Sequence, residues 1–165
     1  IEGGPDRDIT DHVPEDGETA AALAEMKRAE PSFGVADFLG GARGAYEMIL
    51  MAFERGEMED VRGFLSEDVY ESFTDVVATR EEQGLKIDAE FIGIRDMTLS
   101  SASFESGVAS ITVKFVGELV SVVKDANGEI VEGEPGKSRR QKNIWTFERM
   151  MGADDPNWRL VATGE

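Results

Sequence analysis

Cysteine is absent from this chain of 165 residues, and histidine occurs once. The lack of cysteine excludes disulfides, thiolate metal sites and cysteine nucleophiles. The single histidine, His12, lies in an acidic N-terminal stretch, so no Ser-His or Cys-His nucleophile system is expected. Long apolar runs are also missing, because none approaches the ~18 residues of a membrane-spanning helix. We therefore predict a chain that is not an enzyme and that holds neither a metal ion nor a cofactor.

Positive charge is scarce, since 17 Lys and Arg residues stand against 34 Asp and Glu residues, for a formal net charge of -17. Repulsion at this charge opposes the approach of phosphate backbones and of anionic lipid headgroups. We therefore expect no nucleic-acid partner. Two interpretations of the acidic surface stay open, because it either keeps the domain in solution or attracts basic partners.

The chain divides into three segments. Residues 1–18 are acidic, contain two prolines and have almost no apolar periodicity, so we predict a flexible acidic leader. Residues 19–31 are predicted to form a short helix and a linker, because Pro31 ends the helical pattern. Residues 32–165 carry the remaining apolar pattern and are predicted to form a single α+β domain.

Helical spacing dominates residues 32–84. Its longest stretch, residues 35–55, contains Gly40, Gly41 and Gly44, each of which costs up to ~1 kcal/mol against alanine inside a helix. We predict that the helix breaks near Gly40 and Gly41, and the alternative is that these glycines let a neighbour come close. Two further helices are predicted over residues 58–65 and 66–84.

The hydrophobic period changes to two from Lys86 onward, which is typical of strands. Four strands are predicted, over residues 86–99, 108–124, 139–151 and 157–163. We expect a bulge or bend at Gly117, and Asn127-Gly128 is a strong hairpin signal. Helices followed by an antiparallel meander indicate the α+β class, with N-terminal helices packed on a strongly bent antiparallel sheet.

A bent sheet over helices often leaves an unfilled apolar pocket at its wide end. Large apolar residues on the strands and on the long helix are candidates for its lining, although each also suits the core. The predicted pocket residues are Ile49, Phe53, Phe91, Phe115, Trp145 and Phe147.

An enzyme with this architecture would have to rely on a carboxylate or a tyrosine at the base of the pocket. The candidates are Glu90, Glu118, Tyr46 and Tyr70. Each has an alternative interpretation as a surface charge or as a core aromatic ring. The enzyme hypothesis therefore depends on whether these side chains share a cavity.

Basic residues gather at one place in this acidic chain, at Lys137, Arg139, Arg140 and Lys142, and the last three are the candidates for a contact. One interpretation is a charged strand edge that discourages pairing between sheets of different molecules. The other is a contact with a membrane or with an acidic partner. Both interpretations place these side chains on the surface.

Several stretches of the sequence together form a familiar pattern. They are residues 36–49 (ADFLGGARGAYEMI), 64–66 (FLS), 69–73 (VYESF), 111–116 (ITVKFV), 144–149 (IWTFER) and 155–162 (DPNWRLVA). This pattern resembles that of bacterial TimA-type proteins, which are similar to subunit forty-four of the mitochondrial inner-membrane translocase. The resemblance covers residues 33–163, nearly all of the predicted folded part.

The resemblance implies a nuclear-transport-factor-two-like cone over residues 32–165. It further implies a non-catalytic adaptor domain of an inner-membrane-associated protein, which contacts partner proteins and takes a lipid or apolar ligand into its pocket. The small-molecule enzyme described above is the alternative function. The implied location is the inner membrane, peripheral or tethered through a segment that precedes residue 1.

Lipid contact in the mitochondrial relative is tied to the apolar pocket and to an N-terminal helix. Phe33, Phe38 and Leu39 fall in the corresponding helix here, so the resemblance implies that they contact a membrane or a partner. The implied lipid is cardiolipin, which the net charge of -17 opposes. We also expect weak self-association through the N-terminal helix.

Overall fold

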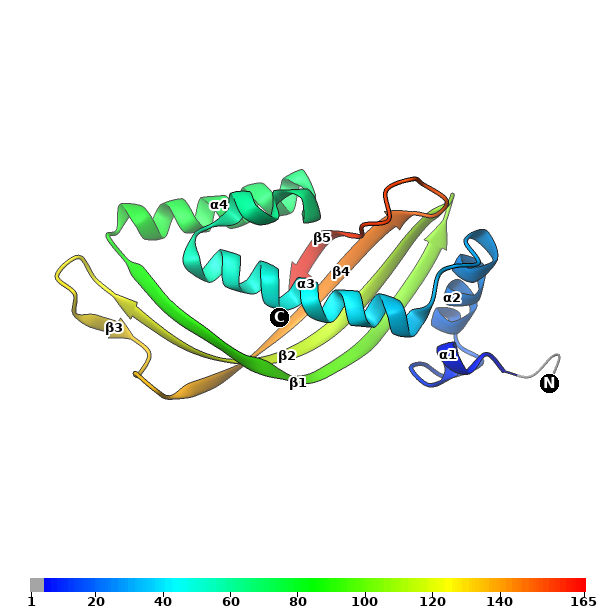
Figure 1. The fold of residues 1–165 in the computed structure, drawn as a ribbon, viewed down its shortest axis with the longest axis horizontal. Coiled ribbons are helices and arrows are strands. Elements are labelled where there is room, and N and C mark those ends of the chain that lie inside the picture. Colours follow the sequence, from blue (N-terminus) through cyan, green and yellow to red (C-terminus); the bar gives the residue numbers. More distant parts are fainter. Residues whose placement is uncertain (1–4) are drawn as a thin grey trace.

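Helices come first along the chain and a sheet follows, as predicted (Figure 1). The computed structural model describes residues 5–165, and residues 1–4 of the predicted leader lie outside this range. The helical elements are α1 (Arg7–Thr10), α2 (Glu18–Ala29), α3 (Val35–Arg55), the 3-10 helix η1 (Met58–Phe64) and α4 (Glu67–Glu82). The strands are β1 (Lys86–Glu105), β2 (Val108–Lys124), β3 (Ile130–Glu132), β4 (Ser138–Met150) and β5 (Arg159–Gly164).

The strands pair antiparallel in the order β1-β2-β4-β5, and β3 pairs with β2 as well. Strand β2 alternates along its length, so that Ile111, Val113 and Phe115 are fully buried on one face. Register shifts in β1, the first of them between Phe91 and Gly93, mark bulges that bend this edge strand. Figure 1 shows the long strands curving beneath α3, which confirms the α+β class with a strongly bent antiparallel sheet.

Helix α3 is continuous, so the predicted break near Gly40 and Gly41 is wrong. Its apolar face, which includes Phe38, Ala42 and Tyr46, is buried in the core. Burial of this face stabilises the helix against the low propensity of its glycines, because helices in proteins owe most of their stability to tertiary packing. Gly40 and Gly41 are on the exposed side, where a Cβ atom would meet no atom of the described residues within 4 Å.

The described part of the predicted leader is folded onto the domain. Ile9 and Val13 are buried in the common core, and the Asp8 carboxylate accepts hydrogen bonds from the backbone amides of Val35 (2.7 Å) and Ala36 (3.0 Å). Asp8 thereby caps the N-terminus of α3, where negative charge is favourable. Lys27 of α2 lies 2.8 Å from the same carboxylate. Two apolar residues are too short a pattern to predict this packing from the sequence.

The hairpin signal at Asn127-Gly128 marks the turn between β2 and β3. Gly128 has a φ of 81°, a conformation that glycine adopts without steric cost. The Asp125 carboxylate accepts hydrogen bonds from the amides of Asn127 and Glu129, so these polar residues stabilise the turn. The sequence missed the short strand β3 that follows the turn.

Candidate ligand pocket

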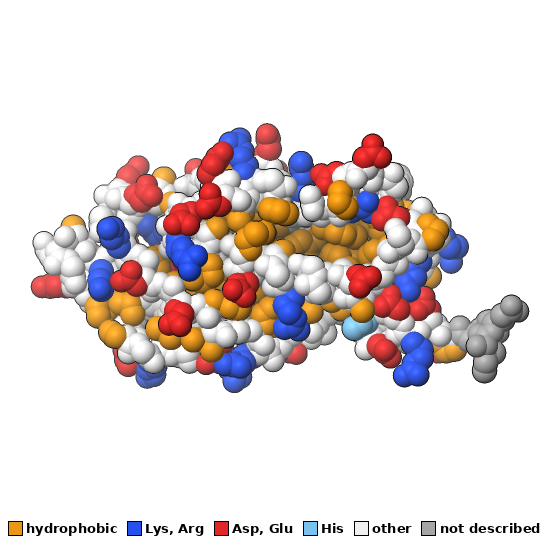
Figure 2. Space-filling view, in the orientation of Figure 1, with side chains coloured by type: hydrophobic (Ala, Val, Ile, Leu, Met, Phe, Trp, Pro, Cys, Tyr) orange, Lys and Arg blue, Asp and Glu red, His pale blue; other side chains and the backbone are white. Residues whose placement is uncertain are grey.

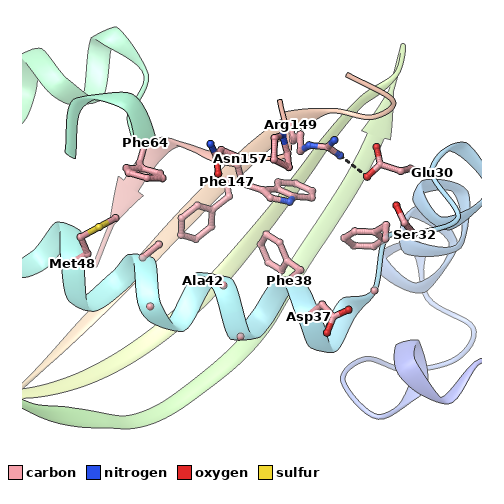
Figure 3. Close-up of a pocket in the computed structure, with 18 residues that line it drawn as sticks. Glu30, Ser32, Asp37, Phe38, Ala42, Met48, Phe64, Phe147, Arg149 and Asn157 are labelled. Atoms are coloured by element: carbon pink, nitrogen blue, oxygen red, sulfur yellow. Dashed lines mark hydrogen bonds and ion pairs between the residues drawn. The ribbon is translucent and has the colours of Figure 1, made fainter. Parts of the chain in front are cut away.

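A cavity of about 500 Å³ lies between the first half of α3 and the segment that joins β4 to β5. Figure 2 shows it as a hollow lined with hydrophobic atoms, beside α3 in the view of Figure 1. Figure 3 shows Phe38, Phe64 and Phe147 around this space. Five aromatic residues line the cavity: Phe33, Phe38, Phe64, Phe147 and Trp158. Its volume is within the range of pockets that bind small ligands.

Aromatic rings from distant parts of the sequence form the walls. The ring centroid of Phe38, on α3, lies 4.7 Å from that of Trp158 and 5.9 Å from that of Phe147 on β4. Phe33, in the linker between α2 and α3, lies 6.0 Å from Trp158. These distances are typical of favourable aromatic pairs. The rings therefore hold the linker, the helix and the sheet together around the cavity.

An ion pair closes one end of the cavity. Arg149 Nη1 lies 2.7 Å from Glu30 Oε2, and only 7% of the Arg149 side chain is exposed. The backbone amide of Gly152 donates to the other oxygen of Glu30 (2.8 Å). Both hydrogen bonds favour the charged carboxylate, so they lower the pKa of Glu30 below its ordinary value of 4.5.

Arg149 also holds the segment after β4. Its Nε donates to the carbonyl oxygen of Asp155 (3.0 Å), and its Nη2 donates to that of Ala153 (3.1 Å). The guanidinium is thus engaged on every side by this chain. We conclude that Arg149 positions the walls of the cavity and that its charge is already balanced by Glu30.

One face of α3 forms the floor of the cavity. Gly40, Gly41 and Gly44, which we call the glycine stripe, all line the cavity and are exposed. Asp37 and Met48 continue the same face in the two directions along the helix, since they lie four residues from Gly41 and Gly44. The absent side chains leave the helix backbone open to the cavity.

The six predicted pocket residues lie in separate surroundings. Phe147 lines the 500 Å³ cavity, whereas Ile49, Phe53 and Trp145 line a second cavity of about 210 Å³ near the C-terminus. Phe91 borders a depression beside β1. Phe115 is fully buried and stacks on Tyr46, with ring centroids 4.3 Å apart.

The residues predicted to contact a membrane or a partner also lie in different parts of the structure. Phe33 and Phe38 line the 500 Å³ cavity, and Leu39 is buried in the core. The basic residues lie at the other end of β4, where Arg139 is 3.7 Å from Glu54 and Arg140 is 3.8 Å from Glu118. Lys142 is exposed. The basic cluster therefore takes no part in the cavity.

The four candidate catalytic residues occupy four separate settings. Tyr46 is fully buried, its hydroxyl donates to Asn143 (2.8 Å), and burial raises its pKa to about 12. Tyr70 donates to Glu59 on the surface. Glu90 is exposed on β1.

The fourth candidate, Glu118, accepts hydrogen bonds from Ser138 and from Arg95, both at 2.6 Å, and these lower the pKa of its carboxyl group. A carboxylate held in this way is a poor proton acceptor near neutral pH. The geometry brings no two of the four candidates together as an acid-base pair.

Sequence reasoning missed Phe64, Trp158 and the glycine stripe as cavity residues. The strand predicted over residues 157–163 begins only at Arg159, so Trp158 lies in the loop before β5. The turn residues Asp155, Pro156 and Asn157 directly before it were the usable signal. Loop aromatics are more often available for binding than those of core strands. The three glycines of the glycine stripe were visible in the sequence as well, but we interpreted them as a helix break and not as an exposed face of a continuous helix.

Fold and site define a class of small α+β domain, in which a bent antiparallel sheet curves around one long helix and leaves an aromatic cavity beside it. The family described as the Tim44-like domain matches residues 19–165. The chain therefore belongs to the Tim44-like domain family.

Its curated relatives are named as translocase subunits. The chain is 24% identical over 160 residues to the mitochondrial import inner membrane translocase subunit TIM44-1 of Arabidopsis thaliana, a match that covers 93% of this chain and 34% of the relative. It is 25% identical over 147 residues to subunit TIM44 of Homo sapiens, covering 87% and 32%. The chain thus spans about a third of the length of these relatives.

Two solved structures show weaker similarity. The intermembrane space region of the chloroplast protein ARC6 has a TM-score of 0.47 and 15% identity, and the match covers 72% of this chain and 85% of that one. A putative NTF2-like transpeptidase from Campylobacter jejuni has a TM-score of 0.26 and 13% identity, covering 72% and 95%.

Residues 5–165 show neither a membrane-spanning helix nor a metal-binding cluster. None of the helices there is both long and apolar enough to cross a membrane. The same residues bring together no group of three or more His, Asp or Glu side chains that would suit a metal ion.

Proposed function

We propose that this chain is a non-catalytic adaptor domain of an inner-membrane-associated protein, which binds an apolar ligand in the 500 Å³ cavity and contacts partner proteins with its surface. Membership of the Tim44-like family supports the adaptor class, because the relatives are named as subunits of an import translocase. That name also supports protein partners and an inner-membrane location. The match covers only part of each relative. Protein partners and the inner-membrane location are therefore proposals for this chain.

The observation that carries the proposal is the aromatic cavity. Five aromatic residues line about 500 Å³ of space that the core does not fill, at the surface of the domain. Large hollows with apolar walls are uncommon in monomeric proteins unless they bind something. The polar side chains Glu30 and Arg149 are paired with each other at its end, which leaves the middle of the cavity apolar.

Partner contacts are proposed at two surfaces. The first is the rim of the cavity, where Phe33 and Phe38 already belong to the lining. The second is the basic cluster of Arg139, Arg140 and Lys142 at the far end of β4. Contact with cardiolipin and weak self-association through the N-terminal helix stay predictions.

Flotation of the purified domain with liposomes tests the membrane part of the proposal. Liposomes of phosphatidylcholine, with and without cardiolipin, are compared at low and high salt. Binding that needs cardiolipin and weakens with salt would point to the basic cluster. Binding to both liposomes that is insensitive to salt would point to the apolar cavity.

A matched pair of variants then tests the cavity itself. Met48 and Val76 are both exposed helix residues, at 39% and 46%, but only Met48 lines the cavity. Met48→Asp is expected to abolish lipid binding, because it places an unpaired charge in an apolar site. Val76→Asp is expected to bind as the unchanged domain does. Equal binding by both variants would overturn the assignment of the ligand to this cavity.

A further inference from the structure

The face of β4 that points to the core changes from aromatic to polar along the strand. Gln141 and Asn143 point to the same side of the sheet as Trp145, because side chains alternate along a strand. This side meets the core, since Asn143 pairs with the fully buried Phe115 of β2 and residues directly opposite share a face. Two uncharged amide side chains therefore stand beside the aromatic rings of the core.

The direction of the hydrogen bonds between these amides is fixed by Arg139. A guanidinium can only donate, so the Gln141 atom that lies 3.0 Å from Arg139 Nη1 is the amide oxygen. The amide nitrogen of Gln141 then donates to Asn143 Oδ1 (3.0 Å), and the hydroxyl of Tyr46 donates to the same oxygen (2.8 Å). Both acceptor positions of Asn143 Oδ1 are thereby engaged.

The amide nitrogen of Asn143, by contrast, keeps its N–H groups free. Asn143 Nδ2 donates to no acceptor within residues 5–165, where the hydrogen bonds of this side chain go to its oxygen. None of the unpartnered nitrogen or oxygen atoms on half-buried side chains in these residues is shut off from solvent, so Nδ2 reaches open space. Asn143 lines the 210 Å³ cavity. The cavity therefore contains a hydrogen-bond donor that the fold holds in place and does not use.

The walls and the size of this cavity suit one aromatic ring. Its apolar lining consists of Ile49, Leu50, Phe53, Phe73 and Trp145. An engineered apolar cavity of about 150 Å³ binds benzene. The cavity of about 210 Å³ therefore holds one ring and about two further heavy atoms, since a water molecule takes up about 30 Å³ of the liquid.

The charges around the cavity favour an uncharged ligand. Arg139 lies 3.7 Å from the buried carboxylate of Glu54, so its charge is balanced within the chain. The described lining contains neither Lys nor Arg, and it includes the acidic residue Glu165. A carboxylate ligand would lose its hydration here without gaining a free cation. A neutral carbonyl oxygen accepts from Asn143 without this cost.

We propose that the 210 Å³ cavity is a second binding site, which takes a small neutral aromatic compound that carries a carbonyl group. The ring lies between the aromatic walls, and the carbonyl oxygen accepts a hydrogen bond from Asn143 Nδ2. Gln141 and Arg139 are positioning residues, because they hold the amide with its nitrogen free. This site is separate from the 500 Å³ cavity and goes beyond the proposed function.

NMR spectroscopy of the isotope-labelled domain, titrated with acetophenone, locates the ligand. The chain has two tryptophans, and Trp145 lines the 210 Å³ cavity whereas Trp158 lines the 500 Å³ cavity. We expect the side-chain amide of Asn143 and the indole N–H of Trp145 to shift and saturate together, while the indole N–H of Trp158 stays in place. A shift of Trp158 alone, or the lack of a saturable shift, would overturn the proposal.

α-Methylstyrene is the matched ligand, because it has the shape of acetophenone with a methylene group in place of the carbonyl oxygen. The measured quantity is the ratio of the two dissociation constants. The double variant Tyr46→Phe, Asn143→Leu is expected to lower the preference for acetophenone about tenfold relative to Tyr46→Phe alone. Removal of both partners avoids an unpaired buried hydroxyl, which would destabilise the fold. An unchanged ratio would overturn the role of Asn143.

Arg139→Met tests the positioning of the amides from the surface. Without the guanidinium, the Gln141 amide is free to turn over, so we expect the preference for acetophenone to fall about threefold. Arg140→Met is the matched control, since this neighbour is exposed and points to the other side of β4. Equal ratios in the two variants would overturn the positioning role. Binding of benzoate as tightly as acetophenone would overturn the neutral ligand class.

Discussion

The two halves of helix α3 meet the same sheet in different ways. In the second half, the Tyr46 ring stacks on Phe115 with centroids 4.3 Å apart, and its centroid lies 4.9 Å from that of Trp145. The space between helix and sheet is therefore filled around Tyr46, and the 210 Å³ cavity lies beyond it, at Ile49 and Phe53. In the first half, the glycine stripe leaves its side of the helix bare, and about 500 Å³ stays open beside it. One helix thus packs on aromatic rings of the sheet at its middle and borders an open cavity along its first half.

The difference arises from where the missing side chains are. In the filled half the small residue is Gly117 on the sheet, and a Cβ there would lie 2.7 Å from the Tyr46 hydroxyl oxygen. Its absence lets a large ring come close. In the hollow half the small residues are on the helix, and no atom of residues 5–165 outside the helix backbone lies within 4 Å of where their Cβ atoms would be. Glycine therefore has opposite consequences on the two sides of the same interface.

The largest expected effect comes from breaking the filled half. Tyr46→Ala removes a fully buried ring and its hydrogen bond to Asn143, so we expect a loss of about 3–5 kcal/mol in the free energy of unfolding. Met48→Ala, two residues further along but 39% exposed, should cost less than about 1 kcal/mol. Urea denaturation of both variants measures the difference. Similar losses for both would contradict the contrast between the halves.

Next in size is the ion pair that frames the hollow half. Glu30→Gln keeps an acceptor for Gly152 but leaves Arg149 without its counter-charge, and we expect a loss of about 1.5–3 kcal/mol at neutral pH. The matched change is Glu59→Gln, whose ion pair with Arg62 is exposed on both sides. This control should change stability by less than about 1 kcal/mol.

The Glu30 effect should also depend on pH with a definite sign. Because the folded pKa of Glu30 is below its ordinary value of 4.5, the carboxylate contributes stability above that value and loses it as the pH falls through the folded pKa. The stability gap between the unchanged domain and Glu30→Gln should be constant above about pH 5 and should shrink in acid. A gap that widens in acid would show that Glu30 is not held as a carboxylate.

Gly117→Ala tests the close approach on the filled side. The added Cβ would overlap Tyr46 Oη and lie 2.9 Å from Cε2, so the ring or the strand must shift. We expect a loss of about 1–3 kcal/mol, as for other overpacked cores. Gly93→Ala on β1 is the control and should not show this loss, because an added Cβ there would meet no atom within 4 Å among residues 5–165. Thermal unfolding of the pair is sufficient to compare them.

The filled half was largely predictable from the sequence, and the hollow half was not. The alternation of Ile111, Val113 and Phe115 predicts the buried face of β2, and the helical spacing of Tyr46 and Ile49 predicts the face of α3 that meets it. Such periodic patterns report burial directly. They do not report which buried residues will border an empty space, because that depends on packing between elements.

The cavity depends on contacts that no local pattern contains. Phe33 meets Trp158 across 125 residues of sequence, and Glu30 meets Arg149 across 119. The helix break predicted at Gly40 and Gly41 failed for the same reason, since propensity counts the cost of the glycines but not the apolar face on the opposite side of the turn. Contacts between residues far apart in the sequence therefore form both the wall of the cavity and its floor.

The smallest effect is also the one whose sign separates the halves most clearly. Gly40→Ala adds a methyl group to the hollow side of α3, where it meets no atom within 4 Å in the described part of the chain. We expect the domain to become more stable by up to ~1 kcal/mol, because alanine has the higher helix propensity and restricts the unfolded chain. Gly117→Ala adds the same group on the filled side and should do the opposite. Urea denaturation measures both, and a loss of stability in Gly40→Ala would mean that the fold itself needs the bare helix face.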